Sequence, residues 1–291
     1  MSDVRIAPTA RELRFAIVTL TLLSVACNGQ VATEESTGRA ESTYAAYGLR
    51  DNDAGHAPSA ERRPNRVRSH GGAVLASPNI ALVYLGMSAE IGVAPSRDDL
   101  ISWTLGSGDA YWGILAQYGV GAGRVVGSYH VPRAAVLTSA VLAHGPIVPV
   151  ADLEASIRAF LHPTSGVAPL PRADAYVFML PDGINVSFGQ RGSKVYTSCI
   201  DVGAYHRFDG DEPYTVIPPC ELGRSARAIS HELAEMSTDP IVGTGWLSDS
   251  DANLGIGEIA DLCNREVTTP IAGFAVTQLW SNRDSDCRPK P

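Results

Sequence analysis

The chain has 291 residues, a formal net charge of −8 and no dense run of Lys or Arg. This charge argues against nucleic acid as a partner, because nucleic-acid-binding proteins present a basic surface to the phosphates. The 28 Gly and 19 Pro residues predict many turns and few long helices.

The N-terminus has the pattern of an export signal. Arg5, Arg11 and Arg14 precede an uncharged apolar run at 15–26, which is 12 residues long. A membrane-spanning helix needs about 20 residues. A basic lead, a short apolar core and small residues at its end are typical of a secretory signal. Residues 1–26 are therefore predicted to be a signal peptide.

The residues before Cys27 resemble a bacterial lipobox, in which the Cys is lipid-modified and becomes the first residue of the mature chain. Ser24 and Ala26 occupy the small-residue positions, although a lipobox usually has Leu or another aliphatic residue where Ser24 stands. We expect an outer-membrane or cell-surface lipoprotein that meets the membrane only through lipid at Cys27, with free secretion as the alternative.

The rest of the chain divides into a tether and a domain. Residues 27–66 are polar and small, and they cannot bury enough apolar surface to offset the loss of chain entropy. They therefore predict a flexible tether. Residues 67–291 are numerous enough to form a single domain with a sizeable core.

Within the domain, hydrophobic patterning predicts strands and helices that mix without strict alternation. This predicts an α+β fold, with helices packed on one twisted sheet in an arrangement that a zincin-like enzyme would have. The expected strands are 80–85, 124–130, 175–180, 184–188, 195–200, 214–217 and 274–280. The expected helices are 98–118, interrupted near Gly106 and Gly108, 151–161, and 222–237.

Four cysteines remain after Cys27, and an even number in an exported chain predicts two disulfides. Four cysteines allow three pairings. We favour Cys199–Cys220 and Cys263–Cys287, because each pair closes a short local loop. A four-cysteine metal site is the alternative, but no C-x-x-C spacing supports it.

The helix at 222–237 carries the most informative motif. Its apolar residues gather on one face, and His231 and Glu235 lie one turn apart on the other. Such a pair can hold one metal ion from a rigid backbone. Glu232 stands where H-E-x-x-H metallopeptidases have their general base. Because Glu235 replaces the second His, the site is more anionic and less selective for zinc.

A third ligand is expected from the segment G-E-I-A-D-L-C. If it forms one helical turn, Glu258 and Asp261 share a face. One of them can bind the ion while the other orients a ligand. Asp239 can cap its loop or join the ion. The expected cofactor is a divalent metal ion, zinc first, with calcium as the alternative in an oxygen-rich site at Asp249 and Asp251.

Structural roles are the alternative for both histidines. Arg224 and Arg227 fall on the same helix face as His231 and Glu235, which is also the pattern of an ordinary solvated face. His206 follows Cys199 and precedes the helix, so we expect it to line the same cleft as a catalytic residue. A satisfied structural His is the other interpretation.

Five segments of the predicted domain form an ordered set of motifs. They are SHGGAVLASPNIALVYLG at 69–86, SC-x5-YH at 198–206, SHELAEMSTDP at 230–240, GEIADLC at 257–263 and WSNRDSDC at 280–287. This set resembles the EXORDIUM-like, or phosphate-induced, proteins and their bacterial relatives, and it spans almost the whole domain. The resemblance implies an extracellular protein, since the plant members are extracellular and linked to growth, and the bacterial His-Glu pattern looks zincin-like.

Two hypotheses follow. The first is an exported, metalloprotease-like hydrolase that uses a metal-activated water. His231, Glu235 and Glu258 bind the ion, Asp261 supports them or is itself a ligand, and Glu232 removes a proton from the attacking water. The second is a non-catalytic cell-surface module with a structural ion. The expected partner is a peptide or a cell-wall polymer.

Overall fold

The computed structural model describes residues 67–86, 97–108, 111–131, 147–163, 169–191, 193–220, 222–248, 257–263, 269–271 and 274–289. All of them belong to one compact unit, 37–291. The predicted signal, Cys27, the tether and the alternative calcium ligands Asp249 and Asp251 lie outside the described residues. Among the described residues, none of the helices is long and apolar enough to cross a membrane.

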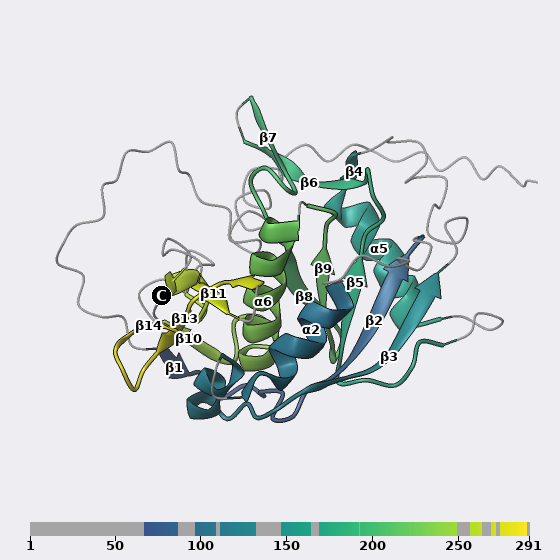
Figure 1. The fold of residues 1–291 in the computed structure, drawn as a ribbon. Helices are drawn as coiled ribbons and strands as arrows, with labels where there is room; N and C mark the ends of the chain where they lie inside the picture. The colour runs from purple at the N-terminus through teal and green to yellow at the C-terminus, as the bar shows by residue number, and fades with distance from the viewer. Residues whose placement is uncertain are drawn as a thin grey trace, which may run out of the picture. The chain divides into compact units, whose positions relative to one another are not determined.

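A five-stranded sheet in the order β3-β2-β5-β9-β8 organises the described part of the chain (Figure 1). Four strands run parallel, and β8, at one edge, is antiparallel to β9. Central parallel strands are buried on both faces, which is why β2 and β5 have unbroken apolar sequences. The strands are β2 (Asn79–Leu85), β3 (Arg124–Val131), β5 (Ala175–Met179), β8 (Tyr205–Asp209) and β9 (Glu212–Ile217).

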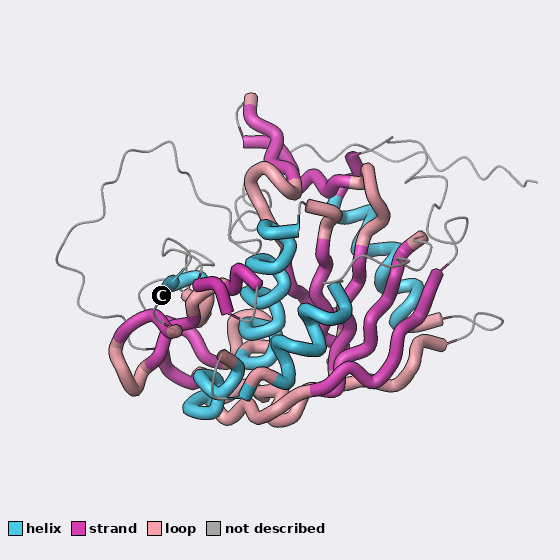
Figure 2. Tube along the Cα trace, viewed as in Figure 1, coloured by secondary structure: helices cyan, strands magenta, loops and turns pink. Residues whose placement is uncertain are grey.

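Helices cover both faces of this sheet, as Figure 2 shows. Side chains alternate between the two faces. Leu82 and Val177 join the core beneath α2, α6 and the 3-10 helix η2. Val83 and Phe178 join the core beneath α5. The helices are α2 (Arg97–Gly106), η2 (Trp112–Tyr118), α5 (Val150–Leu161) and α6 (Leu222–Thr238).

Shorter strands surround the main sheet. One group forms a three-stranded sheet in the order β4-β6-β7, and the others form three antiparallel pairs, β1-β10, β11-β12 and β13-β14. The three-stranded sheet consists of β4 (Ile147–Pro149), β6 (Asn185–Arg191) and β7 (Lys194–Thr197). The pairs consist of β1 (Val67–Ser69), β10 (Trp246–Ser248), β11 (Thr269–Ile271), β12 (Phe274–Val276), β13 (Leu279–Ser281) and β14 (Asp286–Arg288).

The α+β class is confirmed, and the differences from the predicted elements are local. The expected helix 98–118 is two helices, α2 and η2, because Gly106 ends the first and Gly108 has a positive φ of 53°. The expected strand 274–280 is divided into β12 and β13. Strand β8 was not predicted, because its sequence, YHRFD, has only two apolar residues.

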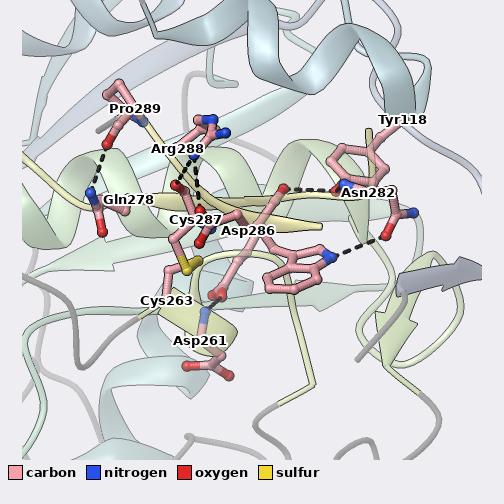
Figure 3. The surroundings of a disulfide bond; sticks show 11 residues. Tyr118, Asp261, Cys263, Gln278, Asn282, Asp286, Cys287, Arg288 and Pro289 are labelled. Atoms are coloured by element: carbon pink, nitrogen blue, oxygen red, sulfur yellow. Dashed lines mark hydrogen bonds and ion pairs between the residues drawn. A yellow bond between two sulfur atoms is a disulfide. The ribbon is translucent and has the colours of Figure 1, made fainter. Parts of the chain in front are cut away.

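Two disulfides join Cys199 to Cys220 and Cys263 to Cys287, the pairing that the short-loop argument favours. The first ties the loop before β8 to the start of α6. The second ties the 3-10 helix η4 (Asp261–Cys263) to β14, as Figure 3 shows. Disulfides form and persist in oxidising compartments, so this pairing indicates a location outside the reducing cytoplasm.

Candidate metal centre

Helix α6 carries three ionisable residues whose side chains are largely buried. The side chains of Glu235, Glu232 and His231 are 3 %, 8 % and 12 % exposed. The helix face that carries His231 and Glu235 is therefore not a solvated one at Glu235. The segment 257–263 lies against it, since the Asp261 backbone N–H donates to Glu235 Oε1 at 3.0 Å.

Strand β8 brings His206 to the same place from the sheet. Tyr205, the preceding residue, packs edge-on against Phe188 in the core beneath α5, with ring centroids 5.4 Å apart. Because successive side chains in a strand point to opposite faces, His206 points towards α6. Its side chain is 5 % exposed, and its backbone pairs with Thr215 of β9.

The segment 257–263, which ends in η4, supplies two more carboxylates. The Leu262 N–H donates to the Glu258 carbonyl at 3.2 Å, so the expected helical turn is present. Its two acids contact different histidines. Asp261 Oδ1 lies 3.6 Å from His231 Nε2, and Glu258 Oε1 lies 3.2 Å from His206 Nε2. Sequence reasoning favoured Glu258 as the third ligand beside His231, whereas the structure puts Asp261 there.

All six predicted residues meet in one cluster, which we call the His–acid cluster: His206, His231, Glu232, Glu235, Glu258 and Asp261. Within it, two groups of three have one donor atom each within 4.8 Å of the others. One group is His231, Glu235 and Asp261. The other is His206, Glu232 and Glu235, so Glu235 belongs to both.

The charges of the cluster shift the pKa values of two members. Burial, with the nearby negative charges of Glu258 and Glu232, raises the pKa of Glu235 well above its ordinary value. Burial alone would lower the pKa of His206, but Glu258 and Glu232 overcome this and raise that pKa well above 6.5. In the absence of another cation, protons therefore neutralise part of the negative charge.

The first group fits a divalent metal ion. Ligands at the usual 2.0–2.1 Å from a tetrahedral zinc ion are about 3.3 Å apart. His231 Nε2 lies 3.0 Å from Glu235 Oε2 and 3.6 Å from Asp261 Oδ1, on either side of that value. The donors are imidazole nitrogen and carboxylate oxygen, which suit zinc and related transition metals. An oxygen-only calcium site is a poorer match because of the imidazoles.

Two buried atoms at the other side of the cluster pair with one another. They are His206 Nε2 and Glu258 Oε1, which lie 3.2 Å apart. When the ring is protonated, Nε2–H faces the carboxylate, and this contact is one of the causes that raise the pKa of His206.

Asp239 is not part of this cluster. Its carboxylate accepts three backbone N–H groups, from Gly243 at 2.6 Å, Thr244 at 3.0 Å and Gly245 at 2.6 Å. Burial and the charge of Glu258 raise the pKa of Asp239, against the lowering effect of these donors. Of the two roles predicted for Asp239, the structure shows the loop cap.

The cluster is enclosed. Its six side chains are between 3 % and 12 % exposed, with His231 and Glu258 at the upper end. Surface cavities of about 640 and 470 Å³ lie elsewhere, and the cluster residues line neither of them. The larger one is bordered by Trp246 and Asn282, the smaller by Arg172 and Asp174.

The pairing inside the cluster is what sequence reasoning missed. The His206–Glu232 hydrogen bond, at 3.2 Å, joins residues on two elements, and β8 was not predicted. One signal was present. Tyr205 and His206 are neighbours in the SC-x5-YH motif. An apolar residue followed by a polar one is the alternation expected of a strand that packs one face on the core.

Comparisons with known proteins give no relative. The chain matches no family model, and no curated protein or solved structure is similar to it. The function is therefore inferred from the His–acid cluster itself.

Proposed function

We propose that this protein is an exported, metal-dependent hydrolase of the peptidase type, with a zincin-like centre on α6. The observation that carries the proposal is the first donor group: His231 and Glu235 from α6 and Asp261 from η4, all buried and within 4.8 Å. Catalytic zinc sites use three protein ligands and keep one position open, whereas structural sites are closed by four.

The chain orients these ligands before any ion binds. Glu235 Oε1 accepts the Asp261 backbone N–H, which turns Oε2 towards His231. The Cys263–Cys287 disulfide acts nearby, because Cys263 is two residues beyond Asp261. In Figure 3 the Asp261 carboxylate points away from the sulfur atoms.

A bound divalent ion supplies a Lewis acid that polarises a carbonyl and lowers the pKa of water. Glu232 is the carboxylate of α6 that the first group leaves unused, and we assign it the role of proton acceptor. His206 holds Glu232 through the 3.2 Å contact between Nδ1 and Oε2. Glu258, at the other ring nitrogen, holds His206.

A second candidate function is a non-catalytic surface module in which the ion is structural. Enclosure of the cluster favours it, since even His231, the most exposed member, is only 12 % exposed. In that case the partner is a protein or a cell-wall polymer that binds elsewhere on the domain. The excess of donors over the four that a structural zinc site needs argues for the hydrolase.

Metal analysis combined with a peptidase assay tests the proposal. The purified protein is expected to hold zinc and to cleave a pool of quenched fluorescent peptides, with loss of activity on chelation and recovery on adding zinc. Glu232→Gln is expected to keep the ion held by His231, Glu235 and Asp261 but lose turnover by at least about 100-fold, as expected for loss of a general base. His231→Ala is expected to lose the ion.

His162→Ala is the matched control, because His162 is 51 % exposed and contacts Asp209, away from the cluster. It is expected to match the wild type in zinc content and activity. A wild type without bound metal would contradict the proposal. A metal-loaded wild type with no activity on the pool, but with a large loss of stability on chelation, would favour the structural ion.

We also propose that export ends in lipid attachment at Cys27, and that the domain is a bacterial relative of the EXORDIUM-like proteins. The ordered sequence motifs are the ground for the second point. Segment 69–72 binds the loop after α6, since the His70 N–H donates to the Gly245 carbonyl at 2.8 Å and the Gly72 N–H to the Thr244 carbonyl at 2.7 Å. Mass spectrometry of the mature N-terminus tests the lipid.

A further inference from the structure

The second donor group lies on the other side of Glu235. His206 Nδ1 is 3.2 Å from Glu232 Oε2 and 3.9 Å from Glu235 Oε2. All three side chains are at most 8 % exposed, and one donor atom from each lies within 4.8 Å of the others. These residues come from two elements, β8 and α6, so the group is assembled by the fold and is not a run of neighbouring acids.

Charge balance leaves room for a second divalent cation. The cluster contains four carboxylates and two imidazoles, all largely buried. With every carboxylate ionised and both rings neutral, the cluster has four negative charges, and a single divalent ion leaves two of them uncompensated. Uncompensated buried charge is strongly unfavourable. A second divalent ion brings the sum to zero.

The carboxylate on the far side of His206 has a role in such a state. A His that binds a metal through one nitrogen carries its proton on the other, and that N–H usually faces a carboxylate that fixes the ring. When Nδ1 binds an ion, the proton is on Nε2. Glu258 Oε1 lies 3.2 Å from Nε2, so it is placed to accept that proton.

We infer that the cluster binds two divalent transition-metal ions, the second held by His206 Nδ1, Glu232 and Glu235, with Glu235 shared between the two. The inference rests on the proposed function only for the presence of the first ion. Two-metal sites clamp the attacking and leaving oxygens of a displacement. With two ions bound, Glu232 is a ligand, and the second ion takes over from it the task of activating water.

The stoichiometry of zinc binding tests this. The full chain is stripped of metal, titrated with Zn²⁺, separated from free metal, and analysed for ions per chain. We expect two ions in the wild type and one in His206→Ala, with His162→Ala binding two as the matched control. Glu258→Gln leaves every proposed ligand in place and is expected to bind the second ion about 10–100-fold more weakly.

A readout that does not depend on the His206 variant folding is electron paramagnetic resonance of the Mn²⁺-loaded wild type. Two ions that share Glu235 are expected to give an exchange-coupled spectrum. One ion per wild-type chain would overturn the second site and leave the proposed hydrolase intact. No bound ion would overturn both. A folded His206→Ala protein that binds no zinc would place His206 in the first site and overturn the inference.

Discussion

Asp239 and Glu235 are both buried carboxylates at the end of α6, four residues apart, but their partners differ. Asp239 accepts three backbone N–H groups from the loop that follows the helix. Glu235 accepts one backbone N–H and otherwise faces two imidazoles and three further carboxylates. Neutral donors satisfy the first acid, whereas the second lies among ionisable side chains.

The comparison teaches how a structural acid can be told from a proposed metal ligand at one helix end. Burial raises the pKa of both groups, so burial and pKa direction do not separate them. What separates them is the origin of the groups that stabilise the carboxylate. The donors to Asp239 are backbone N–H groups within six residues of it, whereas the partners of Glu235 come from β8 and from segment 257–263.

The largest effect on folding is expected from Asp239→Ala. It leaves three backbone N–H groups of the loop without their acceptor, and should lower the free energy of unfolding by about 4 kcal/mol. Urea denaturation of the metal-free protein measures this. Glu235→Gln is the matched comparison, because its amide oxygen still accepts the Asp261 N–H and the raised pKa of Glu235 already favours a neutral side chain in the metal-free protein, so we expect a change below about 1 kcal/mol. Equal losses in the two variants would break the comparison.

Removal of the Cys263–Cys287 bond should lower both the free energy of unfolding and the affinity for zinc. Replacing both residues by Ala opens a loop with a sequence separation of 24, which should cost about 3 kcal/mol. It also frees the segment that holds Asp261, so zinc should bind more weakly. The Cys199–Cys220 pair, with a separation of 21, is the control. Its removal should lower the free energy of unfolding by a similar amount. Unfolding measured with and without zinc distinguishes the two variants, because only the Cys263–Cys287 variant should gain less stability from zinc.

A smaller effect is expected from pH. The raised pKa values of Glu235 and His206 mean that the folded, metal-free protein binds more protons than the unfolded chain above the ordinary values of 4.5 and 6.5. Stability of the metal-free protein must then fall as pH rises, by up to about 1.4 kcal/mol per pH unit for each such proton. Zinc displaces these protons, so its affinity should rise with pH.

Thermal unfolding of the metal-free protein between pH 5 and 8 measures the slope. Glu235→Gln removes one of the two titrating groups and should reduce it. A metal-free wild type that gains stability with rising pH over this range would show that the cluster does not hold these protons.

Much of the fold follows from local pattern. The apolar runs of β2 and β5, the amphipathic α5 and α6, and the two short disulfide loops were all predicted, because each depends on residues close together in the sequence. Strand β8 was missed for the same reason. Its place at the sheet edge is fixed by pairing with β9 and by burial of Tyr205, which a five-residue window does not show.

The members of the site were predicted, but their partners were not. The spacing of His231 and Glu235 on a helix, and of Glu258 and Asp261 on one turn, is a local property. Which acid meets which histidine depends on how segment 257–263 lies across α6. That is set by long-range contacts, such as the 2.7 Å hydrogen bond from the Trp280 N–H to the Ile259 carbonyl.

The most direct test of the central claim is the zinc content of Glu235→Gln beside Asp239→Asn. Both variants replace a buried carboxylate of the same helix end by its amide. We expect Asp239→Asn, once folded, to bind zinc as the wild type does, and Glu235→Gln to bind none at micromolar zinc. A folded Glu235→Gln protein with wild-type zinc content would contradict the assignment of this cluster as a metal centre.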